Sequence, residues 1–241
     1  MPRFFYDPAG PRFCITGEDA AHIANSLRMR PGEELTVCDG KGTDYHCRIV
    51  SVSPGEVALE ELERGPASSE PGVSITLFQG LPKGDKFDWI VQKAVELGAT
   101  RIVPVAAARS ISRPDAKSAG KKRERWQKIA LEAAKQCGRG IIPEVAPLTG
   151  FSDAVAMLKA LDASFFCYEL GGASLQKIPV INKGSAGFFI GPEGGIADEE
   201  AAALQNAQIP AVTLGPRILR TETAPLLVLS VLLFASGNLE A

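Results

Sequence analysis

Hydrophobic and polar residues alternate with a period near two through much of the first third of the chain. The alternation predicts short β-strands at residues 36–38, 45–52 and 56–62, because successive strand positions point to opposite faces of a sheet. The segments DGKG and SPG supply turn residues between these strands. One helix is expected at residues 18–28, with Ala21, Ile23, Ala24 and Leu27 on its inner face. These elements predict a small barrel-like module.

A run rich in glycine, proline and serine follows the last of these strands. Residues 65–72 read GPASSEPG, which is the composition of a linker. We therefore expect a domain boundary here, with one domain at residues 1–72 and a second at residues 73–241.

The pattern changes after the linker, where apolar strands alternate with amphipathic helices. Residues 85–97 place apolar residues at helical spacing and end at Gly98. Alternation of this kind indicates parallel strands joined by crossover helices. The second domain is therefore predicted to be a three-layer α/β unit. Strands are expected at residues 73–78, 102–106, 165–168, 186–190 and 212–214, and helices at 120–137, 154–161, 199–206 and after 223.

The longest apolar stretch lies near the end of the chain. Residues 224–235 are interrupted by Pro225 and Ser230 and fall short of the roughly 18–20 residues that span a bilayer. We interpret this stretch as a buried helix and expect no membrane partner.

Charge is distributed unevenly along the 241 residues, of which 45% are hydrophobic and 22% charged. This balance excludes disordered, collagen-like and coiled-coil chains. The net charge of -2 by itself argues against a nucleic-acid partner. The charges of separate segments change this interpretation. Residues 73–140 carry 14 basic and 6 acidic side chains, a net +8, while the segments on either side are each net -5. The middle of the chain is a basic island.

The cysteines and the N-terminus indicate the compartment. Five scattered cysteines form no C-x-x-C pair, and the chain has two histidines. A disulfide framework and a zinc site are therefore both disfavoured, and no metal is expected. The N-terminal residues MPRFFYDPAG lack the features of a signal or transit peptide. These features favour the reducing cytoplasm.

A glycine-rich loop directly follows the apolar strand at 186–190. It reads Gly191-Pro192-Glu193-Gly194-Gly195, and three glycines in five residues allow a backbone to approach a ligand closely. Neither the dinucleotide fingerprint nor the P-loop fits this sequence. The alternative is a plain strand-to-helix turn, but ligands of parallel sheets bind beyond such strand ends.

A second polar loop precedes the last helix. Residues 214–225 read LGPRILRTETAP, with Thr223 predicted as the helix N-cap and Pro225 in the first turn. Arg220 and Glu222 are either a surface ion pair or charges held against the interior, and the residues alone leave both interpretations open.

The third feature is a run of cations at the predicted start of the helix at 120–137. Lys121, Lys122 and Arg123 lie there, although cations are favoured at the other end of a helix. A solvated helix face is the ordinary explanation. Together with the other cations of the basic island, the run favours a phosphate-contacting surface for RNA or DNA.

Four motifs in order identify a family resemblance. KGDKFDWIVQKAVELGATRIVPV, ERWQKIALEAAKQCGRGIIPEV, IGPEGG and LGPRILRTETAPL, together with the N-terminal HIANSLRMRPGEEL, cover nearly the whole chain. They closely resemble the ribosomal RNA small subunit methyltransferase E family, the 16S rRNA uracil-N3 methyltransferases of the SPOUT superfamily.

The resemblance implies a fold and an activity. The fold is an N-terminal PUA-like β-barrel that binds RNA, followed by an α/β domain threaded as a trefoil knot. The activity is S-adenosylmethionine-dependent methylation of uridine N3 in the 16S rRNA of the small ribosomal subunit, at uridine 1498 in the family, by a homodimer without a metal.

The resemblance also assigns residues by motif. S-adenosylmethionine binding is expected at Phe166, Tyr168, Gly191, Pro192, Glu193, Gly194, Gly195, Leu214, Gly215, Ile218, Leu219, Arg220 and Thr223. RNA binding is expected at Arg3, Arg28, Lys86, Arg109, Arg113, Lys121, Lys122, Arg123 and Arg139, with Arg139 gripping a phosphate near the target.

Arg220 and Glu222 are the expected catalytic residues. The carboxylate of Glu222 is suited to accept the imide proton of uracil, and the guanidinium of Arg220 to stabilise the resulting negative charge. Two alternatives remain, a related enzyme that methylates another RNA position such as a ribose 2′-hydroxyl, and a non-enzymatic RNA-binding module.

Overall fold

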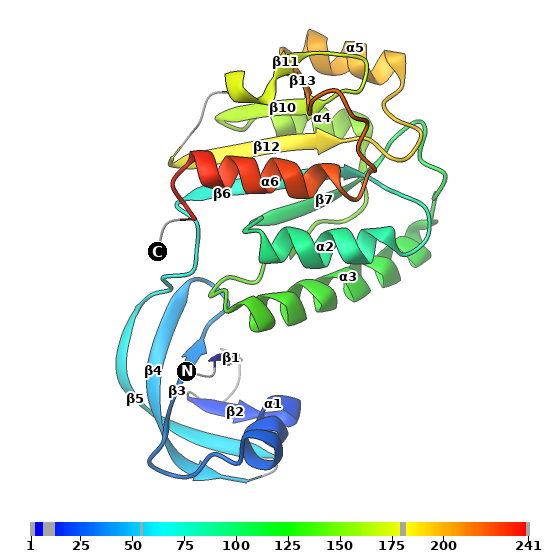
Figure 1. The fold of residues 1–241 in the computed structure, drawn as a ribbon. Coiled ribbons are helices and arrows are strands. Elements are labelled where there is room, and N and C mark those ends of the chain that lie inside the picture. The colour runs from blue at the N-terminus through cyan, green and yellow to red at the C-terminus, as the bar shows by residue number, and fades with distance from the viewer. Residues whose placement is uncertain (1–2, 7–12, 54, 179–181, 240–241) are drawn as a thin grey trace. The chain divides into compact units, whose positions relative to one another are not determined.

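The computed structural model of the protein describes residues 3–6, 13–53, 55–178 and 182–239 (Figure 1). The chain divides into two compact units. The first comprises residues 1–70 and 134–142, and the second comprises residues 71–133 and 143–241. Residues 134–142 therefore belong to the first unit, although they lie far beyond the expected boundary at residue 72.

The first unit is built on a five-stranded sheet with the order β1-β3-β4-β5-β2. All neighbouring strands are antiparallel except β1 and β3. Among the described residues the pairings leave β1 and β2 as edges, so they do not close the expected barrel. The elements are β1 Arg3–Phe5, β2 Cys14–Thr16, α1 Gly17–Ala21, η1 His22–Leu27, β3 Glu34–Cys38, β4 Thr43–Val52 and β5 Glu56–Pro66.

Alternation in the sequence correctly predicted the core of this sheet. Leu35, Val37, Cys47, Ile49 and Val57 are buried on one face, as the period of two requires. The expected linker starts too early, because β5 continues to Pro66 and pairs with the start of β4.

The helix expected at residues 18–28 is found in two parts. One turn of α-helix, α1, runs into a π-helical segment, η1, which ends where Arg28 adopts a left-handed conformation with φ of 53°. Ala20 and Ile23 are buried, whereas Leu27 is 41% exposed. The wider π turn rotates later residues away from the face that a regular 3.6-residue period predicts.

The second unit is the predicted α/β fold. Its eight strands follow the order β11-β13-β10-β12-β6-β7-β8, with β9 also on β7, and all the pairings are parallel. The strands are β6 Val73–Gly80, β7 Arg101–Ala106, β8 Glu144–Val145, β9 Thr149–Gly150, β10 Ala163–Cys167, β11 Ala173–Ser174, β12 Gly184–Ile190 and β13 Ala211–Thr213.

Helices cover both faces of this sheet. α4 contacts β7, β10 and α5, whereas α6 contacts α2, and Figure 1 draws α4 and α6 on opposite faces. The central strands β6 and β12 are buried nearly throughout, with Phe78, Phe188 and Phe189 among the largest buried side chains. The helices are α2 Lys86–Glu96, α3 Ala116–Cys137, α4 Phe151–Lys159, η2 Leu175–Lys177, α5 Asp198–Asn206 and α6 Ala224–Ala235.

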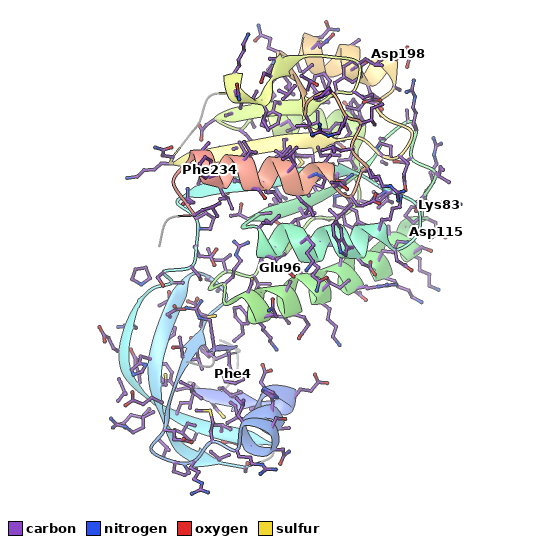
Figure 2. All side chains as sticks on the ribbon, viewed as in Figure 1. Phe4, Lys83, Glu96, Asp115, Asp198 and Phe234 are labelled. Atoms are coloured by element: carbon purple, nitrogen blue, oxygen red, sulfur yellow. The ribbon has the colours of Figure 1, made fainter. Side chains whose placement is uncertain are left out.

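Two expectations about helices need correction. α3 begins at Ala116 rather than residue 120, because Asp115 accepts a hydrogen bond from the Ser118 N–H at 2.7 Å and caps it. The run Lys121–Arg123 therefore lies beyond the first turn, where the helix dipole has little effect. α6 is not fully buried, since Phe234 is 76% exposed and points away from the core (Figure 2).

Candidate functional site

The two loops singled out from the sequence form one cavity. It has a volume of about 740 Å³ and lies at the carboxyl ends of β10, β12 and β13. Its walls come from residues 190–195, from residues 213–222 and from residues 167–169, with Lys86 of α2 on one side. This is the edge where parallel sheets bind ligands.

Buried hydrogen bonds tie the two loops together. The Thr221 hydroxyl donates to the Gly191 carbonyl at 2.7 Å and accepts from Gln79 Nε2 at 2.9 Å. Gln79 is fully buried at the end of β6, and Thr221 is 7% exposed. Because buried polar groups are costly when unpaired, this network holds each loop to the other and to the sheet.

Close packing explains why the loop at residues 191–195 is rich in glycine. Gly195 has φ of 71°, and a Cβ there would collide with Glu169 Oε1. A Cβ on Gly80 would lie 2.6 Å from the Pro192 ring. The bare backbone of Gly80 therefore lets the loop lie close to β6, and the left-handed conformation of Gly195 favours glycine.

Charged groups from three segments meet in the cavity. Lys86 Nζ lies 3.0 Å from Glu193 Oε1 and 3.5 Å from Glu222 Oε2. Arg220 Nη1 lies 3.9 Å from Glu222 Oε1, and its side chain is 82% exposed. The Glu222 side chain is 19% exposed, so the pair is neither a free surface ion pair nor fully interior.

Hydrogen bonding perturbs two of these groups. Burial raises the pKa of Glu193, but hydrogen bonds from Lys86 and from backbone N–H groups outweigh it and hold that pKa below its usual range. The Glu193 carboxylate, with Glu222 as a further contributor, raises the pKa of Lys86. Both groups are therefore charged at neutral pH.

Most residues expected at the cofactor site line this cavity. Two do not. Phe166 is fully buried in the core, because it lies inside β10 rather than at its end. Thr223 occupies the N-cap position of α6 outside the cavity lining, and its side chain makes no capping hydrogen bond. The expected cofactor residues that do line it are Tyr168, Gly191, Pro192, Glu193, Gly194, Gly195, Leu214, Gly215, Ile218, Leu219 and Arg220, and the expected catalytic residue Glu222 lines it too.

The sequence reasoning missed several cavity residues. Thr213 lies directly before the second loop, and its position beside that motif was a usable signal. Lys86 was assigned to RNA instead, and it is more than 100 positions away from both loops. No local pattern indicates that its side chain reaches them.

Comparison with known proteins identifies the family. A family model described as an RNA methyltransferase domain matches residues 69–233, and an RNA methyltransferase PUA domain matches residues 15–62. The ribosomal RNA small subunit methyltransferase E of Bacillus subtilis (strain 168) is 39% identical over 245 residues, covering 96% of each chain. The chain belongs to the ribosomal RNA small subunit methyltransferase E family.

Solved structures are similar over nearly the whole length. A ribosomal RNA small subunit methyltransferase E from Neisseria gonorrhoeae bound to S-adenosylmethionine is 34% identical with a TM-score of 0.84, and 97% of each chain is covered. A Legionella pneumophila protein in complex with S-adenosylmethionine is 30% identical with a TM-score of 0.83, again over 97% of each chain. The family fold therefore extends across both units.

Arg139 was expected to hold an RNA phosphate, but it forms a buried ion pair with Glu70. Its side chain is 4% exposed and donates to Glu70 Oε2 from Nη2 at 2.6 Å. Glu70 also accepts from the N–H groups of Gly140 and Ile141 at 2.8 and 3.0 Å. A guanidinium enclosed in this way is not available to a phosphate, so the expectation for Arg139 is wrong in this structure.

The other side chains expected to bind RNA differ in their exposure and in the bonds that they already make. In the first unit, Arg28 is exposed, whereas Arg3 is bonded to Asp44 and to the Gly138 carbonyl. In the second unit, Arg113 is exposed and donates to Ala108 O at 2.9 Å, and Lys121 is exposed on α3.

The remaining expected contacts are partly engaged within the second unit. Arg109 Nη1 donates to Gly194 O at 3.2 Å, and Arg123 Nε donates to Val145 O at 3.0 Å. Lys122 Nζ lies 5.8 Å from the ring centroid of Trp126. These side chains remain at the surface, so phosphate binding there would add to or replace local bonds.

Two features that indicate other functions do not occur in the described residues. None of the helices there is both long and apolar enough to cross a membrane. Nor do three or more His, Cys, Asp or Glu side chains in that part of the chain gather into a cluster able to hold a metal ion.

Proposed function

We propose that this protein transfers a methyl group from S-adenosylmethionine to N3 of a specific uridine in 16S rRNA of the small ribosomal subunit, uridine 1498 in the family. The observation that carries the proposal is the cavity between the two loops, in which Glu222 and Arg220 lie beside glycine-rich backbone. The Neisseria gonorrhoeae relative, bound to S-adenosylmethionine, supports the choice of cofactor.

The residues of the cavity fit this cofactor on two structural grounds. The volume of about 740 Å³ is within the range of small-molecule sites. Glu222 Oε2 is enclosed yet receives no hydrogen bond among the described residues. The two loops and the end of β10 would hold the cofactor, with Tyr168 and Gly215 among the residues around it.

The chain supplies proton transfer, charge stabilisation and orientation. S-adenosylmethionine, when bound, supplies an already activated methyl group. Uracil N3 carries an imide proton, and Glu222 is positioned in the cavity wall to accept it. Arg220 has an exposed side chain in the cavity wall and is suited to stabilise the negative charge that develops on a uracil carbonyl. Holding the nucleophile beside the methyl group supplies much of the remaining acceleration.

RNA is proposed to be held by both units. The first unit matches an RNA methyltransferase PUA domain, and exposed cations such as Arg28 and Lys121 are suited to phosphate contacts. Binding should therefore weaken steeply with salt, because each neutralised phosphate contributes a slope of about -0.7 to -0.9 in log affinity against log salt. A salt-independent affinity would argue against these contacts.

We further propose a knotted homodimer. The chain crosses from the sheet face of α5 to that of α6 through residues 214–223, beside the loop at 191–195 (Figure 1). Such a crossing supports the trefoil knot of the SPOUT superfamily. Leu227 and Phe234 leave apolar surface exposed on α6, at 37% and 76%, which supports association with a second copy.

The decisive experiment uses labelled S-adenosylmethionine with either naked 16S rRNA or assembled small subunits from a strain that lacks the enzyme. Mass mapping should find 3-methyluridine at one position. A ribose 2′-O-methyl product would overturn the N3 assignment in favour of a related methyltransferase. Absence of both label and cofactor binding by calorimetry would instead indicate a non-enzymatic RNA-binding module.

Glu222→Gln tests the proposed base. Turnover should fall by about 10²–10⁴-fold, while the cofactor dissociation constant stays close to that of the parent. Glu144→Gln is the matched control, because Glu144 is a half-exposed carboxylate at the sheet edge paired with Arg101 at 3.1 Å. Equal activity of Glu222→Gln and the parent would rule out the base assignment.

A further inference from the structure

Lys86 is the first residue of α2 and connects the two loops of the cavity by charge. Its ammonium lies 3.0 Å from Glu193 in the first loop and 3.5 Å from Glu222 in the second. Figure 2 labels Lys83, which precedes α2, and Glu96, which is the last residue of α2. Lys86 lies at the end of the helix nearer to Lys83 in the sequence. The side chain is 37% exposed and lines the cavity.

The two carboxylates depend on Lys86 to different degrees. Glu193 also receives the Lys83 backbone N–H at 3.2 and 3.3 Å on its two oxygens, so it has other donors. Glu222 Oε2 is enclosed and receives no hydrogen bond within the described residues, which leaves the ammonium at 3.5 Å as its nearby charge. Removing Lys86 therefore leaves Glu193 with its backbone donors but takes from Glu222 Oε2 the charge that lies 3.5 Å away.

The other charges near Glu222 cannot replace this ammonium. Arg220 reaches the opposite oxygen at 3.9 Å from an 82% exposed side chain, so solvent screens it. Glu169 and Glu193 in the cavity wall are carboxylates, so they repel Glu222 rather than hold it. Arg217, also in the wall, is exposed.

We propose that Lys86 is a positioning residue for the methyl transfer, holding the Glu222 carboxylate turned into the cavity. The inference rests on the proposed function, because it assigns Glu222 as the proton acceptor. Lys86 itself exchanges no proton with the substrate in this scheme, so its effect passes through Glu222.

The test compares Lys86→Met, which removes the charge and keeps the length, with Lys86→Arg, which keeps the charge. For Lys86→Met we expect kcat to fall by about 10–100-fold, a part of the usual effect of a general base. The cofactor dissociation constant, measured by calorimetry, should stay within about threefold, and Lys86→Arg should recover most of the rate.

Lys93→Met is the matched control. Lys93 lies two turns along the same helix, where it pairs with Glu96 at 2.8 Å, and its replacement should leave kcat unchanged. If Lys86→Met has the same kcat as this control, or if it abolishes cofactor binding, the inference is wrong. A parent protein that leaves 16S rRNA unmethylated refutes the proposed function instead.

A second measurement needs neither cofactor nor RNA. The titration of the Lys86 ammonium, followed by nuclear magnetic resonance of the protein alone, should shift to lower pH in Glu193→Gln and in Glu222→Gln. The larger shift belongs to Glu193→Gln, because its hydrogen bond is the main cause of the raised pKa of Lys86. If neither variant changes the titration, the two ion pairs do not form in solution and the positioning role is refuted.

Discussion

Replacing Arg139 with methionine should destabilise the first unit substantially. The change keeps most of the side-chain length but removes the guanidinium from Glu70, whose side chain is 12% exposed. Charge centres about 4 Å apart interact by about 4 kcal/mol at an effective dielectric constant near 20. Removing one partner of a buried pair typically costs about 3–5 kcal/mol, because the other charge stays buried alone. Glu70 keeps its hydrogen bonds from Gly140 and Ile141, so we expect the lower end, about 3 kcal/mol.

The assay is urea unfolding followed by circular dichroism, with Glu70→Gln and the double variant completing a thermodynamic cycle. The double variant should lose less than the sum of the single changes, since the pair is coupled. Arg64→Met is the control, because Arg64 is 61% exposed and pairs with Glu61 at 3.5 Å; its cost should stay below about 1 kcal/mol. If Arg139→Met retains full stability but loses affinity for RNA, Arg139 contacts phosphate after all.

Three further predictions concern the loops of the cavity. Thr221→Val removes the hydroxyl bonded to the Gly191 carbonyl and should cost about 1–3 kcal/mol in thermal unfolding, with weaker cofactor binding by calorimetry; unchanged values would mean that the loops hold together without it. Gly80→Ala should cost about 1–3 kcal/mol by overpacking against Pro192, and an affinity for cofactor equal to that of the parent would show that the loop can move aside. Because the folded-state pKa of Glu193 is lowered, the stability it contributes is present above its unfolded pKa of about 4.3 and is lost as pH falls through the lower folded value. Glu193→Gln should therefore show a flatter acid limb of stability against pH in urea titrations, and identical limbs would contradict the shift.

Local sequence patterns predicted elements best where each residue's environment repeats regularly. Phe87, Ile90, Val91, Ala94 and Val95 recur at helical spacing, and α2 buries all five. Prediction was weaker at the ends of elements, because single hydrogen bonds decide at which residue a helix or strand begins. α3 starts four residues earlier than expected because Asp115 caps it.

The site residues also differ in how well the sequence predicted them. The glycine loop and the polar loop were recognisable as motifs, and their positions after strands placed them at the sheet edge where the cavity lies. Phe166 is buried inside β10, whereas Tyr168 follows the end of that strand and lines the cavity. The alternation of residues along a strand does not show at which residue the strand ends.

The α/β class of the second unit, its parallel sheet, the two loops and the family could all be recognised from the amino-acid sequence. These follow from periodicity and from contiguous motifs, which are local properties of a chain. The roles of individual charges became visible in the folded structure. Arg139 is buried against Glu70, and Lys86 lies between Glu193 and Glu222. The sequence does not show which partner a charged side chain has. The electrostatic energy of that side chain depends on its burial and on neighbours that distant parts of the chain bring within a few ångströms.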